Sequence, residues 1–117
     1  ETEKKEDILE TVKALSKLPI DGIKFHHLYV AKGTKLAKMY ENGKYKPLEQ
    51  EEFVDVLVGS LELLPPNVVI QRLMGSPRKD ELLSPAWSLR KTETLNLIQE
   101  TLIKRDTWQG KNYFHRG

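Results

Sequence analysis

Residues 22–34 of this chain read Gly-Ile-Lys-Phe-His-His-Leu-Tyr-Val-Ala-Lys-Gly-Thr, and this stretch decides the fold. The part from 23 to 30 is rich in β-branched and aromatic residues, which favours a buried strand. A turn precedes it at 21–22, and a loop at 32–34 leads into a helical pattern. Strand, loop and helix form the unit of parallel α/β proteins, whose ligands bind at the carboxyl ends of the strands.

Helical and strand patterns alternate along the rest of the chain. Apolar spacing predicts helices over 3–18, 35–41, 49–64 and 89–105, the second of them capped by Thr34. A second strand is predicted over 68–73, and its unbroken Val-Val-Ile start predicts burial on both faces. The polar segment that follows, up to Ser88, is expected to wrap the surface. Trp87 and Trp108 are expected to form small satellite cores.

Composition indicates one globular domain spanning residues 1–117, with 38% apolar and 31% charged residues. No apolar run approaches the roughly 20 residues of a membrane span, and the amino end has no signal-peptide pattern. The absence of cysteine excludes disulfides, thiolate metal sites and a cysteine nucleophile within this chain. We therefore expect a cytoplasmic protein that binds no membrane, with no metal site of its own.

The predicted strands need more partners than this chain offers. Two strands joined by a helical crossover should lie parallel, and a sheet of two strands is only marginally stable. The fold class predicted is therefore α/β, with two parallel strands and about four helices. We expect further strands to come from a longer parent chain or from a second copy, which would make the isolated chain a homodimer.

The run from Gly22 to Thr34 resembles the second half of a radical S-adenosylmethionine enzyme. The resemblance is to a branch of uncharacterised bacterial iron–sulfur oxidoreductases of the Elongator catalytic-subunit type. Other matching segments are Leu64-Pro65-Pro66, 69–75, Pro85-Ala86-Trp87-Ser88 and Thr107-Trp108-Gln109-Gly110-Lys111. The resemblance covers nearly the whole chain.

The resemblance implies the carboxyl-terminal portion of a partial (β/α)6 barrel, similar to a TIM barrel. Such enzymes bind a 4Fe-4S cluster through three cysteines after the first strand, and the cluster with S-adenosylmethionine yields a 5′-deoxyadenosyl radical. This chain has no cysteine. The resemblance thus implies a segment that shapes the cofactor and substrate side, is inactive alone with no cofactor bound, and has the amino-terminal half of its parent as partner.

The same resemblance suggests site residues. Arg72, Met74 and Gly75 would lie on the S-adenosylmethionine side, and the substrate side would comprise His26, Tyr29, Lys32 and Gly33. No catalytic residue can be named.

Each of these assignments has a simpler structural interpretation. Adjacent histidines in a strand point to opposite faces, so one of His26 and His27 is expected to be packed and the other to line the barrel, with His26 favoured for lining. Residues 32–34 could hold an anion or merely cap a helix. Arg72, at the end of a buried strand, would need either a structural ion pair or a carboxylate of a ligand. Gly75 either allows close approach of a nucleoside or only makes a turn.

A second hypothesis is a non-catalytic α/β interaction module. Cysteines upstream of Glu1 would favour the enzyme, and a natural start near Glu1 would favour the module. Residues 71–117 hold nine Lys or Arg against five Asp or Glu, so RNA is a further conceivable partner. The basic pairs 78–79, 90–91 and 104–105 lack the interleaved aromatic residues of an RNA-binding platform.

Overall fold

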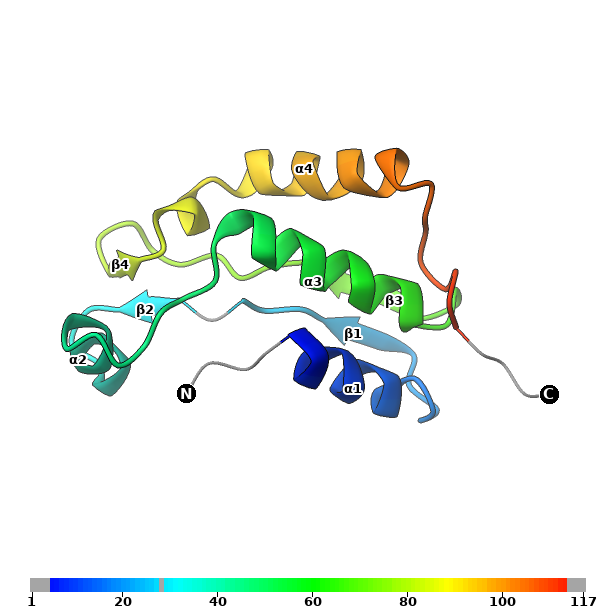
Figure 1. The fold of residues 1–117 in the computed structure, drawn as a ribbon, viewed down its shortest axis with the longest axis horizontal. Helices are drawn as coiled ribbons and strands as arrows, with labels where there is room; N and C mark the ends of the chain where they lie inside the picture. The colour runs from blue at the N-terminus through cyan, green and yellow to red at the C-terminus, as the bar shows by residue number, and fades with distance from the viewer. Residues whose placement is uncertain (1–4, 28, 114–117) are drawn as a thin grey trace.

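The computed structural model describes residues 5–27 and 29–113 and has an α/β fold. The elements in chain order are α1 (Lys5–Leu15), β1 (Gly22–Lys24), β2 (Val30–Ala31), α2 (Lys35–Glu41), α3 (Gln50–Leu63), β3 (Val69–Arg72), β4 (Leu82–Ser84), the 3-10 turn η1 (Ala86–Leu89) and α4 (Lys91–Lys104). The four helices and two sheets of two strands are arranged along an elongated body (Figure 1). No helix of the described part is both long and apolar enough to cross a bilayer.

Strands β1 and β3 form the parallel pair that the sequence predicts. Gly22 lies opposite Val69 and Ile23 opposite Ile70, and after a shift in register Lys24 lies opposite Arg72. The helices α2 and α3 provide the crossover between the two strands. The shift is a β-bulge on β3, where Gln71 and Arg72 together face a single residue of β1.

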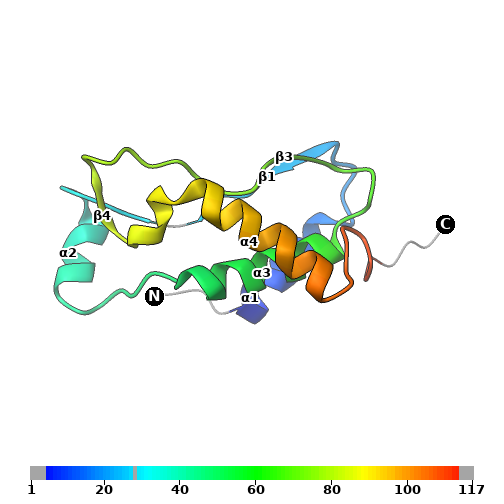
Figure 2. The same cartoon turned by 90° about the horizontal axis from the view of Figure 1, so that it is seen from above.

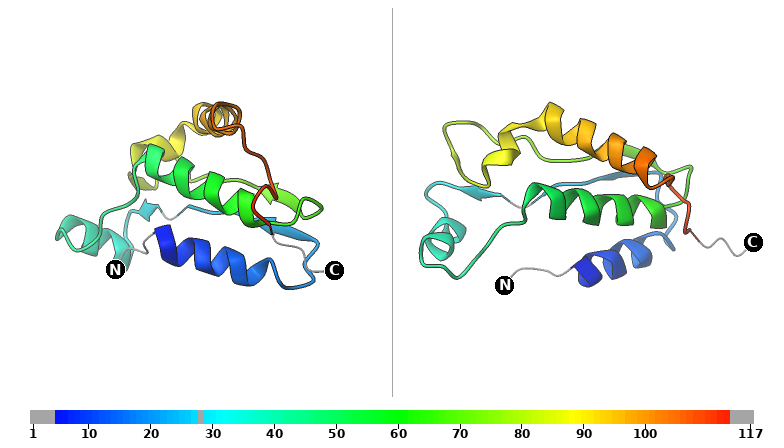
Figure 3. Two further views of the ribbon diagram at one scale, coloured as in Figure 1. Left: turned by 45° about the vertical axis from the view of Figure 1, so that its right-hand side comes forward. Right: turned by 45° about the horizontal axis from the view of Figure 1, so that its top comes forward.

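The helices cover only one face of this sheet. Seen from above, β1 and β3 lie along one side of the molecule, with α1, α3 and α4 on the other (Figures 2 and 3). Ile23, Phe25 and Ile70 pack from the strands into the main core, whose buried centre includes Leu57. On the opposite face Val69 is 60% exposed. The prediction that the second strand is buried on both faces is therefore wrong.

The single strand predicted over 23–30 is also wrong, because it is divided. β1 ends at Lys24, and β2 begins at Val30 and pairs antiparallel with β4. β4 lies in the segment that was expected to be without strands. Two residues of β2 and three of β4 form a small second sheet beside α2, around buried Val30 and Tyr45.

Helix ends follow local chemistry. The Thr34 hydroxyl accepts a hydrogen bond from the Ala37 backbone N–H at 3.1 Å, which begins α2 as predicted. A capping box between Glu49 and Glu52 begins α3. Halfway along α3, Asp55 binds Lys5 of α1 at 2.7 Å and Arg105, the residue that ends α4, at 3.0 Å. This carboxylate therefore joins the three large helices on the solvent side.

The segment after α4 folds back onto the start of β3. The side-chain Nε2 of Gln109 donates hydrogen bonds to the carbonyl oxygens of Pro65 and Val68, both at 2.8 Å. Trp108 next to it is 55% exposed and stacks under the Lys111 ammonium. The prediction of a satellite core is thus wrong for Trp108, whereas Trp87 is buried in the main core.

Candidate functional site at the carboxyl ends of the parallel strands

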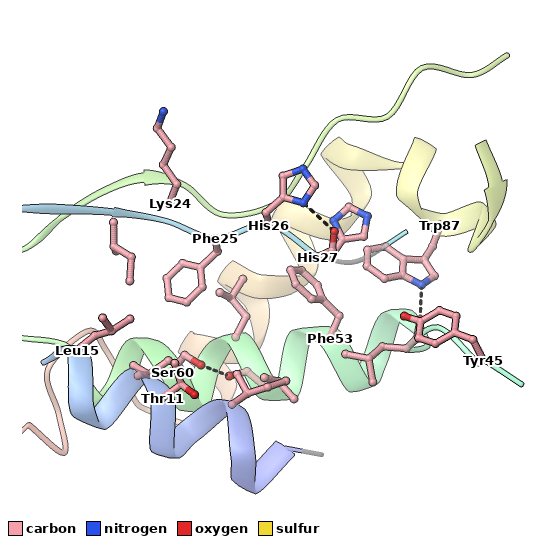
Figure 4. Close-up of a pocket in the computed structure, with 16 residues that line it drawn as sticks. Thr11, Leu15, Lys24, Phe25, His26, His27, Tyr45, Phe53, Ser60 and Trp87 are labelled. Atoms are coloured by element: carbon pink, nitrogen blue, oxygen red, sulfur yellow. Dashed lines mark hydrogen bonds between the residues drawn. The ribbon is translucent and has the colours of Figure 1, made fainter. Parts of the chain in front are cut away.

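Two adjacent histidines stand where the parallel pair ends. At this end of the pair a backbone hydrogen bond runs from the Phe25 N–H to the Arg72 carbonyl at 2.7 Å. Beyond it lie His26 and His27, outside the strand (Figure 4). Gly75 is hydrogen-bonded to His27. Carboxyl ends of parallel strands are the usual place for ligands in α/β proteins, so this is the candidate site.

His27 is buried, with 5% of its surface exposed, and both ring nitrogens are used. The backbone N–H of Gly75 donates to Nδ1 at 3.2 Å, and Nε2 lies 2.8 Å from the Ser88 hydroxyl oxygen. Because a backbone N–H can only donate, Nδ1 carries no proton. The Nε2–H therefore donates to Ser88, and His27 is neutral.

Aromatic side chains enclose this neutral imidazole. The ring centroid of Trp87 lies 4.6 Å away and that of Phe53 5.5 Å away. The indole N–H of Trp87 donates to the Leu48 carbonyl at 2.9 Å, which fixes the orientation of the indole. Burial, with a smaller contribution from the neighbouring His26, lowers the pKa of His27 to about 4.

His26 is exposed and is oriented by a backbone contact. Its Nδ1 lies 2.9 Å from the carbonyl oxygen of His27, so Nδ1 donates and Nε2 is left as an acceptor. Within the described part of the chain Nε2 has no hydrogen-bond partner. His27 is the packed histidine of the pair, whereas the lining of a barrel by His26 stays a prediction, and Phe25, His26 and His27 are not in a strand. The two rings are stacked, with centroids 6.1 Å apart.

Gly75 lies directly beneath the His26 ring. A Cβ atom at this position would come within 2.6 Å of Nε2 of His26. The close approach that a glycine permits here is therefore taken by the imidazole. Tyr29 completes the group, with its ring centroid 5.5 Å from that of His26 and 5.4 Å from that of His27.

The other predicted site residues fall elsewhere. Met74 is fully buried in the main core. Arg72 is exposed, so the expectation of a buried arginine is wrong, because the bulge turns its side chain out of the core. Lys32 and Gly33 form the turn between β2 and α2, where Gly33 has a φ of 79°. Neither lines the cavity described next.

A cavity of about 430 Å³ lies on the helix side of the site. Its wall near β1 consists of Phe25, Phe53 and Trp87, and α1 supplies Ile8 and Val12. Figure 4 shows Phe25 directed toward this cavity, whereas Lys24 and His26 are directed to the opposite side of the backbone. The lining of the cavity is mostly apolar, with Thr11, Ser60 and the two histidines among its polar members.

Sequence reasoning did not identify Ser88 as the partner of His27. Ser88 lies 61 residues from His27 in the chain, and no local pattern links them. The only available signal was the Pro85-Ala86-Trp87-Ser88 segment, which had been noted for its resemblance.

The chain does not provide ligands for an iron–sulfur cluster. Such clusters are held by cysteine thiolates, and the sequence has none. The described residues also contain no group of three or more His, Asp or Glu placed to hold a metal ion. Any cluster of a longer parent protein would need ligands from another part of it.

Comparisons with known proteins identify the family of this chain. The model of the Radical_SAM C-terminal domain matches residues 20–104. The YtqA protein of Bacillus subtilis is 37% identical over 97% of this chain and 35% of its own length. The MJ0486 protein of Methanocaldococcus jannaschii is 38% identical over 92% of the chain and 34% of its own. The YhcC protein of Escherichia coli is 32% identical over 69% of the chain and 26% of its own.

The chain thus spans about a third of the length of these curated relatives, or less. The match of the domain model covers β1 through α4, and so includes both parallel strands and the histidine site. This chain belongs to the Radical_SAM C-terminal domain family.

Proposed function

We propose that this chain forms the last strand–helix units of a partial (β/α)6 barrel in a radical S-adenosylmethionine enzyme. The observation that carries the proposal is the one-sided coverage of the parallel pair. In such barrels helices pack on the outer face of the strands and ligands occupy the inner side. The helix-free face of β1 and β3 would then be the barrel interior.

The site residues acquire roles in this arrangement. His26, on the helix-free side, offers an Nε2 that in the neutral ring can accept a hydrogen bond or a proton from a substrate. Tyr29 adds a ring beside it. His27 is a positioning residue, since it holds the carbonyl that orients His26 and the N–H of Gly75. The Arg72 guanidinium, exposed at the same sheet, suits a carboxylate of cofactor or substrate.

The hard chemistry would come from the cofactors. S-adenosylmethionine and a 4Fe-4S cluster supply radical chemistry in this class of enzyme, and the protein supplies binding and orientation. Because this chain lacks cluster ligands, we assign it only the cofactor-side and substrate-side surface. The partner in this proposal is the amino-terminal part of the same longer protein.

The test uses the longer protein that carries this chain, reconstituted anaerobically with iron and sulfide. We expect a bound cluster and release of 5′-deoxyadenosine from S-adenosylmethionine. His26→Gln should reduce substrate turnover while cluster content stays unchanged, and Lys38→Gln on the exposed side of α2 is the matched control. A longer protein that binds no cluster and does not cleave S-adenosylmethionine would contradict the proposal.

The alternative is a non-catalytic interaction module, with RNA among its conceivable partners. The structure weakens the RNA version, because the arginines of the three basic pairs are already engaged. Arg78 binds Asp80 and Glu81, Arg90 binds Glu93, and Arg105 binds Asp55. Retention of RNA by this chain at physiological salt would favour the module.

A further inference from the structure

Two cations stand side by side on the helix-free face of the parallel sheet. Lys24, the last residue of β1, lies opposite Arg72, the last residue of β3. Both side chains are exposed. Neighbouring strands are about 4.8 Å apart, so the two side chains can reach the same small group.

The bulge on β3 creates this pairing. Regular alternation after Ile70, which packs in the core, would direct Gln71 outward and Arg72 back inward. Because Gln71 and Arg72 share one position opposite β1, both are exposed, and Leu73 is the next residue that packs on the core. Bulges are frequent beside functional sites, where they redirect a side chain.

The two charges are not neutralised within the described part of the chain. Neither Lys24 nor Arg72 has an acidic group within 4.0 Å or a side-chain hydrogen bond to another described residue. Like charges directly opposite each other on neighbouring strands are destabilising. A local conflict of this kind is expected where function requires it, and a bound anion would relieve it.

Other polar groups lie on the same side. The Gln71 amide lies over Gly22, since its Nε2 would be 2.9 Å from a Cβ there. His26 follows Lys24 by two residues and is directed to the same side (Figure 4). A ligand held by the cations would therefore extend toward Nε2 of His26.

We propose that Lys24 and Arg72 together bind an anionic group, a carboxylate or a phosphate, of a ligand on the helix-free face. This inference deepens the proposed function and rests on it for the statement that this face lines a barrel. It adds Lys24 to the site. It also states the class of ligand, which is a molecule with at least one negative charge next to the portion that extends to His26. Two cations on one anion form charge-assisted hydrogen bonds, and Arg72 can contribute two of them.

The experiment is an amide chemical-shift titration of this 117-residue chain with inorganic phosphate and with acetate. Ionic strength is held constant, because salt screens exposed charges. We expect saturable shifts centred on residues 22–26 and 70–75. Lys24→Gln and Arg72→Gln should each weaken phosphate binding by about fivefold or more. Lys104→Gln, at the exposed end of α4, is the matched control and should leave binding unchanged.

A third titration, with S-adenosylmethionine, distinguishes the source of the anion. Shifts at Lys24 and Arg72 that disappear in the variants assign the pair to the cofactor carboxylate. A response to phosphate or acetate without one to S-adenosylmethionine assigns it to the substrate.

Shifts that do not saturate, or that persist in Lys24→Gln and Arg72→Gln, would overturn the proposal that these two residues bind an anion together. That failure would leave the cluster reconstitution of the longer protein unaffected. Failure of the reconstitution would conversely leave the binding measured on this chain unaffected.

Discussion

The backbone N–H of Gly75 donates a hydrogen bond to Nδ1 of His27 at 3.2 Å, just beyond the point where the β1–β3 ladder ends. The His27 side chain thus joins the two chain segments where backbone hydrogen bonds between the strands have ended. Its Nε2–H also donates a hydrogen bond to Ser88 in η1. The carboxyl ends of both strands and the segment before α4 are consequently held by one neutral imidazole.

Acid should destabilise the protein through this residue. The pKa of His27 is lowered from 6.5 to about 4 in the folded chain, so below pH 6.5 the unfolded chain binds the extra proton. The contribution of neutral His27 to the free energy of unfolding is complete above pH 6.5 and is lost as the pH falls from there toward 4. We expect the free energy of unfolding to fall by up to roughly 3 kcal/mol over this range. Urea unfolding at several pH values measures it.

The matched variant is His27→Leu, which places an apolar residue of similar size between Phe53 and Trp87. Its unfolding free energy should depend little on pH between 6.5 and 5. Below that range Glu93 begins to contribute, because its hydrogen bond with Gln50 lowers its pKa in the folded chain from the ordinary value of 4.5. Asp55, whose pKa is lowered chiefly by its hydrogen bond to Lys5, affects stability only at still lower pH. An unchanged pH dependence in His27→Leu would show that another group titrates in this window.

Ser88→Ala should destabilise the fold by about 1–3 kcal/mol. The substitution removes the acceptor of the His27 Nε2–H and leaves a buried donor unsatisfied. Chemical denaturation measures the loss, and Ser76→Ala serves as control. Ser76 contacts only the exposed Lys91 ammonium among described residues, so its replacement should change stability by less than about 0.5 kcal/mol. Equal effects at both positions would refute the assigned role of Ser88.

Gly75→Ala should displace His26. The new methyl group would lie 2.6 Å from Nε2, so the ring must rotate and give up its hydrogen bond to the His27 carbonyl. We expect a shift of the His26 ring nitrogen resonances and a loss of about 1 kcal/mol or more in stability.

A double-mutant cycle checks the cause. In a His26→Ala background the obstructing ring is gone, so Gly75→Ala should then reduce the free energy of unfolding by much less. An identical cost in both backgrounds would mean that the strain arises in the backbone around Gly75 and not at His26.

The parts of the fold that local chemistry determines were predicted well. α2 begins and ends at residues 35 and 41 as expected, because Thr34 caps it and Asn42-Gly43 ends it. The parallel pairing of the two strand segments was also predicted, from the helical crossover between them. These features depend on neighbours in sequence or on chain connectivity.

The parts that depend on distant contacts were not predicted. The strand expected over 23–30 is interrupted because the His27 ring turns inward to Gly75 and Ser88, which are 48 and 61 residues away. β4 is only three residues long and owes its existence to β2. The exposure of Arg72 follows from a bulge that no propensity indicates. In the site, a packed histidine next to a second one was predicted, but the orientation of His26 by the His27 carbonyl was not.

Gln109→Glu should destabilise the chain by roughly 2–4 kcal/mol. The Gln109 Nε2 donates to two carbonyl oxygens, and a carboxylate oxygen in its place could only repel them. Differential scanning calorimetry at pH 7 measures the effect. Gln99→Glu on the exposed side of α4 adds the same charge without this contact and should be nearly neutral. Similar losses in both variants would indicate a general effect of charge.

The last prediction concerns the outer edge of β1, which has no strand partner within the described residues. The Asp21 carbonyl and the Phe25 N–H bond to β3, so alternation leaves the Lys24 backbone N–H and C=O at the open edge. Open edges of this kind template pairing between chains, although a short strand and a charged lysine limit it. We therefore expect weak, concentration-dependent dimerisation of the isolated chain in sedimentation equilibrium.

Two variants at one position make that expectation specific. Lys24→Pro removes the edge N–H and leaves the hydrogen bonds from Phe25 to Arg72 and from Val69 to Asp21 in place, and proline is tolerated at a sheet edge. This variant should be monomeric. Lys24→Gln keeps the N–H and removes the protecting charge, so it should dimerise at least as strongly as the original chain. A monomer at every concentration for both the original chain and Lys24→Gln would show that this edge does not pair, and that the missing neighbour of β1 is not a second copy of the chain.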